Sequence, residues 1–152
     1  MADVYARLAE LGITVPAVVP PAAAYIPAVQ TGNYVYVSGQ LPLVDGTLSA
    51  TGLVGGEVTP EQAKQAARTC AVNILAAVEG LVGLGRVVKV VKLLGFVASS
   101  PGFTAQPAVV NGASELLAEV FGEAGRHARS AVGVAALPFN APVEVEAILE
   151  IA

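Results

Sequence analysis

The feature that most constrains the fold is an alternation of side chains over residues 143–151. Successive side chains of an extended strand point to opposite faces of a sheet. One face therefore carries Val143, Val145, Ala147, Leu149 and Ile151, and the other carries Glu144, Glu146 and Glu150. We expect helices to cover the apolar face. The acidic face should look towards solvent or towards another subunit.

Further elements follow from residue types and from the residues that begin or end helices. β-Branched and aromatic residues predict strands over residues 34–38, 87–98, 130–136 and 142–151. Apolar stripes predict helices over residues 4–11, from Thr59 to Gly83 or Gly85, and over residues 108–123. Thr59 and Gln62 form a capping box, and Pro60 suits the first turn. Prolines before Ala28 and glycines within residues 39–56 predict loops.

The order strand, helix, strand, helix, strand, strand predicts an α+β sandwich. One mixed β-sheet should carry two helices on one face. Because the sequence contains no repeat, low-complexity tract or linker, residues 1–152 are expected to form a single domain.

Composition predicts association between copies of the chain. Only 13% of residues are charged while 55% are hydrophobic, against a usual charged share of about 25%. A homo-oligomer would bury the excess apolar surface. Lys89, Lys92 and the prolines and glycines of residues 16–27 interrupt the longest apolar runs, so no membrane span is expected. No signal peptide is visible, which predicts a cytoplasmic protein.

Charge and the scarcity of ligating residues exclude several kinds of site. A net charge of −4 argues against nucleic acid as a partner. Cys70 is the single cysteine and should be buried, so one chain can form no disulfide and no cysteine-based metal site. His127 is the single histidine, and a multi-histidine metal site would need several subunits. We therefore expect no bound metal.

Two oppositely charged residues open the last two apolar runs. Arg129 begins the first run, Glu144 begins the second, and Pro138 and Pro142 mark a turn between them. A hairpin would bring these runs together. Small neighbours of Arg129 leave room for a ligand carboxylate, which arginine binds through two parallel hydrogen bonds. The equal alternative is a structural ion pair between Arg129 and Glu144 or Glu146.

Other motifs support weaker hypotheses. His127 lies between Arg126 and Arg129, either as a general base or as a structural residue that orders the turn into the strand. The glycines of residues 52–56 lack the lysine and serine or threonine of a phosphate-binding loop, which favours a flexible loop. No Gly-x-Ser-x-Gly elbow exists. Any catalysis should therefore be acid–base chemistry on a bound water.

Several segments together resemble the YjgF/RidA family, also known as endoribonuclease L-PSP. The resemblance rests on residues 32–42 (GNYVYVSGQLP), residues 128–132 (ARSAV), Leu137-Pro138 and residues 143–147 (VEVEA), in this order. Residues 112–114 and 125–127 are similar to a longer subgroup of the family.

The resemblance implies a chorismate-mutase-like fold and a homotrimer with three sites at subunit interfaces. It also implies an enzyme that hydrolyses reactive enamines and imines, such as 2-aminoacrylate, to 2-keto acids and ammonia. No cofactor or metal is expected. The implied trimer agrees with the shortage of charged residues.

Residue by residue, the resemblance implies two catalytic side chains. Arg129 matches the arginine that clamps the substrate carboxylate, and Glu144 matches the glutamate that positions or activates water. The implied substrate-binding residues are Tyr25 near the site entrance, Ser38 and Gly39 in the pocket lining, Ala131 where many members have cysteine, and Ser114. Ser114 is the nearest match to an asparagine of the second long helix, which the resemblance implies is replaced in this sequence.

Two alternatives to an imine deaminase remain. A non-catalytic protein that binds small carboxylates, as a sensor or chaperone, would use the same cleft and the same Arg129. An endoribonuclease is disfavoured by the net charge of −4. Glu144 discriminates between the first two, because hydrolysis should need this carboxylate whereas binding should not.

Overall fold

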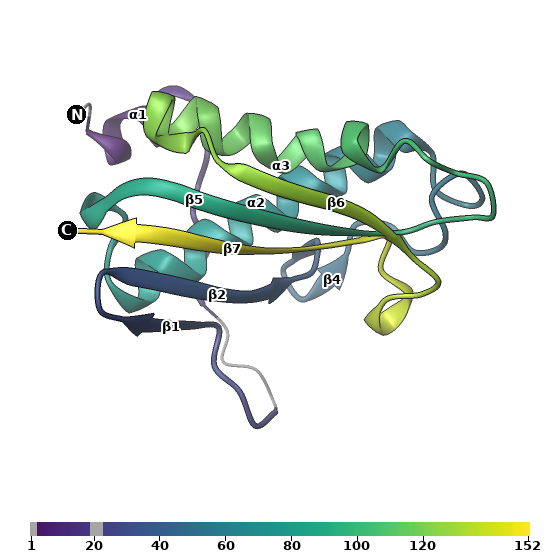
Figure 1. Ribbon diagram of the computed structural model, residues 1–152, viewed down its shortest axis with the longest axis horizontal. Coiled ribbons are helices and arrows are strands. Elements are labelled where there is room, and N and C mark those ends of the chain that lie inside the picture. Colours follow the sequence, from purple (N-terminus) through teal and green to yellow (C-terminus); the bar gives the residue numbers. More distant parts are fainter. Residues whose placement is uncertain (1–2, 19–22) are drawn as a thin grey trace.

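The computed structural model describes residues 3–18 and 23–152, and its main element is a mixed five-stranded sheet (Figure 1). The strand order is β1-β2-β7-β5-β6. The strands are β1 (Ala28–Thr31), β2 (Tyr34–Gln40), β5 (Val87–Ala98), β6 (Ala128–Val134) and β7 (Val143–Ile151). The pair β5–β6 is parallel, while the other pairs are antiparallel.

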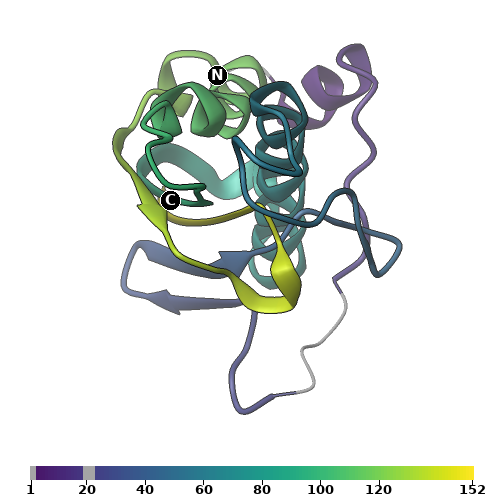
Figure 2. The same cartoon turned by 90° about the vertical axis from the view of Figure 1, so that its right-hand side faces the viewer.

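Two long helices, α2 (Pro60–Leu81) and α3 (Gln106–Phe121), cover one face of the sheet. Figure 1 looks onto the opposite face, with α2 behind the strands, and Figure 2 shows the same layers from the side. The short helix α1 (Val4–Glu10) contacts α3. The prediction of an α+β sandwich with two helices on one face is therefore confirmed.

The alternation that predicted strand β7 is borne out by burial. The side chains of Val143, Val145 and Leu149 are fully buried, and those of Ala147 and Ile151 nearly so. Glu144, Glu146 and Glu150 are half-buried on the face away from the helices. Strand β7 contacts α2, and burying its aliphatic side chains there contributes about 1.5–3 kcal/mol for each large side chain.

The capping box at the start of α2 is also confirmed. The amide of Gln62 donates to Thr59 Oγ1 at 3.1 Å, and the amide of Thr59 donates to Gln62 Oε1 at 2.9 Å. Pro60 occupies the first turn. These contacts satisfy amide groups that have no partner within the helix, so local sequence suffices to define this end.

The predicted hairpin of the last two strands is wrong, because β5 lies between β6 and β7. The connection from β5 through α3 makes β6 a parallel edge strand, and β7 then pairs with both β5 and β2. A turn signal marks where the chain reverses but not which strand it joins. The apolar strand β7 occupies a central position, while the more exposed β6 takes the edge.

Within residues 39–56, predicted as a loop, the structure contains a two-stranded hairpin of β3 (Leu43–Val44) and β4 (Thr47–Leu48). Its turn residues Asp45 and Gly46 have positive φ of 50° and 79°, as Asp-Gly hairpin turns require. Two-residue strands carry too little alternation to be recognised. Strand β1 was not predicted either, and β6 begins two residues before its predicted start.

Across residues 3–18 and 23–152, the structure contains no helix with the length and apolar character needed to cross a membrane.

Candidate functional site

Arg129 lies on the edge strand β6 and reaches towards α3. Its Nη1 donates to Asn111 Oδ1 at 2.8 Å and to Ser114 Oγ at 3.2 Å. Both acceptors are neutral. Among the described residues, no carboxylate lies within ion-pair distance of this guanidinium. The alternative of a structural ion pair with Glu144 or Glu146 is therefore wrong within one chain.

The contacts of Arg129 leave one edge of the guanidinium available. Arginine has five N–H donors in a planar fork, and Nη1 already serves two protein acceptors. In the part of the chain that the structure describes, no hydrogen bond involves Nε or Nη2. These two nitrogens lie on the same edge and match the two oxygens of a carboxylate.

Sequence analysis missed Asn111, although this residue makes the shorter of the two contacts with Arg129. Asn111 and Ser114 are three positions apart in α3, so they lie on the same side of that helix. An asparagine does therefore stand beside Arg129 on this helix. The signal that could have revealed it is a pair of polar residues at helical spacing within an otherwise apolar segment.

His127 makes two hydrogen bonds that define its tautomer. Nδ1 lies 2.7 Å from the carbonyl oxygen of Gly125, and Nε2 lies 2.9 Å from Ser114 Oγ. Because a carbonyl oxygen only accepts, Nδ1 carries the proton and Nε2 of the neutral ring accepts from Ser114. The contact with Gly125 fits a structural residue that orders the turn into β6.

Glu144 lies on β7 and packs against Gly39 of β2. A Cβ atom at position 39 would overlap the Glu144 carboxylate, so glycine is what allows this approach. Partial burial raises the pKa of Glu144, and the neighbouring charge of Glu146 raises it further. A carboxylate with a raised pKa is a better base than an exposed one.

Ser38 ties the segment before β1 to strand β2. Its Oγ donates to the carbonyl oxygen of Ile26 at 2.7 Å, and its amide donates to that of Pro27 at 2.8 Å. Both contacts lie close in sequence to Tyr25, whose side chain is 56% exposed. Ser38 and Gly39 sit where the pairing of β2 with β7 becomes irregular, between Val37 and Gln40. Ser38 therefore fixes the segment that directly follows Tyr25.

One chain does not bring the two predicted catalytic residues together. Arg129 is paired with Leu93 of β5, whereas Glu144 is paired with Phe96 of the same strand. Arg129 points to the helix side of the sheet, where α3 lies. Glu144 alternates with the buried Val143 and Val145, so it points to the uncovered side. For the candidate site, we call Arg129, Asn111, Ser114 and Ala131 the arginine half-site, and we call Glu144, Gly39, Ser38 and Tyr25 the glutamate half-site.

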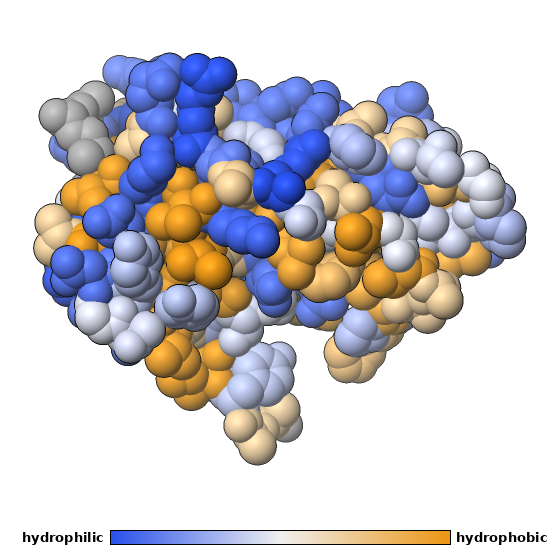
Figure 3. Space-filling model, in the orientation of Figure 1, coloured by the Kyte–Doolittle hydropathy of each residue, from blue (hydrophilic) through white to orange (hydrophobic). Residues whose placement is uncertain are grey.

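The sheet face that carries Glu144 also exposes large apolar side chains. Four of them are 42–48% exposed on β1, β2 and β6, namely Val29, Tyr34, Tyr36 and Val132. Figure 3 views this face and shows hydrophobic residues lying between hydrophilic ones. Exposed apolar surface of this kind typically marks an interface.

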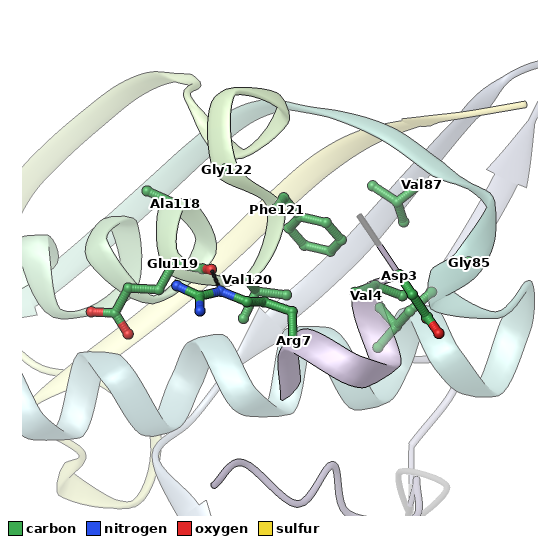
Figure 4. Close-up of a pocket in the computed structure, with 11 residues that line it drawn as sticks. Asp3, Val4, Arg7, Gly85, Val87, Ala118, Glu119, Val120, Phe121 and Gly122 are labelled. Carbon is green, nitrogen blue, oxygen red and sulfur yellow. Dashed lines mark hydrogen bonds between the residues drawn. The ribbon is translucent and has the colours of Figure 1, made fainter. Parts of the chain in front are cut away.

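A separate hollow lies between α1 and the end of α3 (Figure 4). Arg7 lies in this hollow, but its Nε already donates to the carbonyl oxygen of Glu119 at 2.8 Å and its Nη1 to Glu10 at 3.0 Å. None of the residues predicted for the site lines this hollow. We therefore place the candidate site at the two half-sites.

Among residues 3–18 and 23–152, no group of three histidine, cysteine, aspartate or glutamate side chains is arranged to hold a metal ion. Cys70 is buried as predicted, and burial raises the pKa of its thiol well above the usual range. A buried neutral thiol is neither a nucleophile nor a metal ligand.

The sequence is similar to known proteins along most of its length. The family model described as "Endoribonuclease L-PSP" matches residues 16–151. Protein TCP17 of Trypanosoma cruzi is 49% identical over 150 residues, which cover 97% of this chain and 94% of that protein. A 2-iminobutanoate/2-iminopropanoate deaminase of Dermatophagoides farinae is 34% identical over 139 residues, which cover 91% of this chain and 94% of that protein.

Solved structures share the fold. A protein of unknown function from Agrobacterium tumefaciens is 53% identical with a TM-score of 0.90, covering 98% of this chain and 92% of that chain. The Escherichia coli protein TdcF, solved with bound serine, is 26% identical with a TM-score of 0.65, covering 91% of this chain and 94% of that chain. Together with the family match over residues 16–151, these similarities establish that the chain belongs to the endoribonuclease L-PSP family, also called the YjgF/RidA family.

Proposed function

We propose that this protein hydrolyses small 2-imino acids and their enamine tautomers to 2-keto acids and ammonia, at sites formed between the subunits of a homotrimer. The observation that carries the proposal is the half-buried guanidinium of Arg129, which two neutral side chains hold and no described carboxylate neutralises. Such a group is suited to bind the carboxylate of a small substrate.

The separation of the two half-sites supports an arrangement between subunits. Arg129 lies on an edge strand and Glu144 on the uncovered face, so a second chain packed on that face could place its arginine half-site opposite the first chain's glutamate half-site. The exposed apolar residues of the face provide the surface for such packing. A closed ring repeats one contact, and three copies would create three equal sites.

The proposed reaction uses only protein side chains and water. Arg129 would hold the carboxylate and orient the C=N bond for attack. Glu144 would accept a proton from the attacking water and pass it to the nitrogen. Glu144 would then take the remaining proton from the carbinolamine hydroxyl and give it to the nitrogen, so that the C–N bond breaks, ammonia leaves and the C=O bond of the keto acid forms. The raised pKa of Glu144 suits both the acceptance and the return of the proton.

Two similar proteins add support for this substrate class. The relative from Dermatophagoides farinae is named for the deamination of 2-iminobutanoate and 2-iminopropanoate. The structure of TdcF contains serine, a small molecule with a carboxylate. Both names are consistent with a site built around an arginine.

The direct test is hydrolysis of imines generated in situ by an amino-acid oxidase, followed as keto-acid formation. We expect wild type to accelerate the reaction and Arg129→Ala and Glu144→Ala to lose this acceleration. Arg126→Ala is the matched control, since Arg126 is exposed and pairs with Glu123. No acceleration by wild type across imines of alanine, 2-aminobutyrate and serine would contradict the proposal.

The second candidate is a binding protein for small carboxylates, which the geometry of Arg129 supports equally well. Glu144 separates the two candidates. If keto acids bind in an Arg129-dependent manner while imines are not hydrolysed faster, the binding protein is the better description. An endoribonuclease is less well supported, because the net charge is −4 and both ring nitrogens of His127 already make hydrogen bonds.

A further inference from the structure

We propose that His127 is a positioning residue, which acts through the Ser114 hydroxyl to fix the edge of Arg129 that takes the substrate carboxylate. The inference rests on the proposed function in its choice of ligand, but the hydrogen-bond chain is a property of the protein alone. The chain runs from the carbonyl oxygen of Gly125 through His127 and Ser114 to Arg129.

The first step concerns the imidazole. Gly125 ends the short 3-10 helix after α3 and is buried, and its carbonyl oxygen accepts from His127 Nδ1 at 2.7 Å. This contact holds a proton on Nδ1, so that in the neutral ring Nε2 is the acceptor. The ring cannot serve as an external base through Nδ1, and its other nitrogen is already directed at Ser114. His127 is thereby a fixed acceptor inside the protein.

The second step concerns the single proton of Ser114. A hydroxyl has one donor and two acceptor positions, and its proton rotates to the available acceptor. Because Nε2 of His127 accepts this proton, the lone pairs of Ser114 Oγ turn towards Arg129 Nη1, 3.2 Å away. Without His127, the hydroxyl proton would lose this fixed acceptor and would turn to other acceptors, such as a carbonyl oxygen of the preceding helical turn, which would move the oxygen away from its position beside Nη1.

The third step concerns the guanidinium. Asn111 and Ser114 accept both hydrogens of Nη1, and this pair of contacts defines the plane of the group. With Nη1 occupied, Nε and Nη2 form the edge that faces a ligand. Loss of one of the two anchors would let the group rotate about its terminal torsions, and the productive orientation of the fork would be populated less often.

The neighbouring charges do not explain the placement of His127 in another way. Arg126 is exposed, its side chain pairs with Glu123 at 3.5 Å, and its carbonyl oxygen accepts from Lys89 Nζ at 3.5 Å. Within the described residues, no hydrogen bond joins the imidazole to Arg126, Glu123 or Lys89. Among residues 3–18 and 23–152, the only side chain that forms a hydrogen bond with His127 is that of Ser114.

The first experiment uses the fact that the sequence contains one histidine. Nitrogen-15 spectra of the imidazole in wild-type protein near neutral pH report its tautomer without assignment of other histidines. We expect the Nδ1–H form, with Nε2 showing the shift of a hydrogen-bond acceptor. In Ser114→Ala, the Nε2 resonance should move while the tautomer remains. An Nε2–H tautomer in wild type would overturn the proposal.

The second experiment measures affinity for 2-oxobutanoate by calorimetry and KM for the corresponding imine. We expect His127→Leu to lower the affinity for 2-oxobutanoate by about 10-fold and to raise KM by a similar factor, because the charge-assisted hydrogen bond between Ser114 and Arg129 is weakened. The value of kcat should change by less than about 3-fold. His127→Gln can still offer an acceptor to Ser114 and should restore most of the affinity. Arg126→Ala should match wild type.

A double-mutant cycle separates positioning from a general loss of structure. If His127 acts through Ser114, the double variant with Ser114→Ala and His127→Leu should bind 2-oxobutanoate no more weakly than Ser114→Ala alone. Additive losses, or a Gln variant as weak as the Leu variant, would overturn the proposal, as would a wild type that does not bind 2-oxobutanoate. Absence of imine hydrolysis with 2-oxobutanoate binding intact would instead contradict only the proposed deamination.

Discussion

The arginine half-site and the glutamate half-site are prepared in different ways. Arg129 is held by Asn111 and Ser114 within its own chain. Glu144 is held by close packing against Gly39, and burial raises its pKa. The guanidinium of Arg129 is thus fixed by two hydrogen-bond acceptors of its own chain, whereas the Glu144 carboxylate is positioned by packing against a glycine. Under the proposed function, the arginine half-site would bind the substrate carboxylate and Glu144 would act on the water.

The largest expected effect separates binding from reaction. Arg129→Ala should weaken 2-oxobutanoate binding by about 100-fold or more, because a bidentate charge-assisted contact is lost. Glu144→Ala should leave that affinity within about 3-fold of wild type while imine turnover is lost. Calorimetry and keto-acid assays on the same preparations check both. Equal losses of affinity in the two variants would remove the distinction between the half-sites.

Mixing the two inactive variants tests whether the half-sites come from different chains. In trimers reassembled at random from equal amounts of Arg129→Ala and Glu144→Ala, about a quarter of the interfaces combine an intact arginine with an intact glutamate. We expect turnover to recover to about that fraction of wild type after co-refolding, with each variant alone inactive. The control is the double variant co-refolded with Arg129→Ala, which forms no intact interface. No recovery by verified mixed trimers would place both residues of a site in one chain.

A smaller effect is expected when the glutamate half-site is disturbed and the arginine half-site is not. The methyl group of Gly39→Ala would overlap the Glu144 carboxylate and displace it. We expect kcat to fall by about 10-fold while 2-oxobutanoate affinity stays near wild type, as for a misplaced catalytic group. Gly85→Ala is the matched control, because its added methyl group would meet only ordinary contacts with Tyr5. Unchanged kcat in Gly39→Ala would show that the position of Glu144 is not critical.

The smallest effect concerns stability against pH. Because burial raises the folded-state pKa of Glu144, the folded protein binds this proton more tightly than the unfolded chain. The contribution of Glu144 to the free energy of unfolding is therefore fully present below its unfolded-state pKa. This contribution is lost as the pH rises through its folded-state pKa. Glu144→Gln should lack this fall and melt about 2 °C higher at neutral pH, in thermal scans from pH 4 to 8. Glu150→Gln is the control. If Glu144→Gln melts no higher than wild type at neutral pH, burial does not penalise the charge of Glu144.

Several elements could be predicted because their signals are local. The alternation of residues 143–151 identified the buried face of β7, and the capping box of Thr59 and Gln62 identified the start of α2. In both elements, the residues that make up the signal lie within a few positions of one another in the sequence. The residues 43–48 were missed because each strand of that hairpin has only two residues, too few to show a period.

The site was predictable only in part. The resemblance pointed to Arg129 and Glu144, while the residues around Arg129 alone left a ligand and a structural ion pair as equal alternatives. The contacts of Arg129 with Asn111, 18 positions earlier, and with Ser114, 15 positions earlier, arise from the packing of α3 on the sheet. A pattern along one segment carries no information about the neighbour that another segment supplies.

By itself, the sequence determined the class of the fold, the inward faces of its strands and helices, and the two charged residues that stand out from a weakly charged chain. Only the tertiary structure decided that β5 separates β6 from β7, that Arg129 and Glu144 face opposite sides of one sheet, and that His127 reaches Arg129 through Ser114. The physical reason is that side-chain period depends on the local backbone, whereas strand order and side-chain partners depend on which distant surfaces bury each other best.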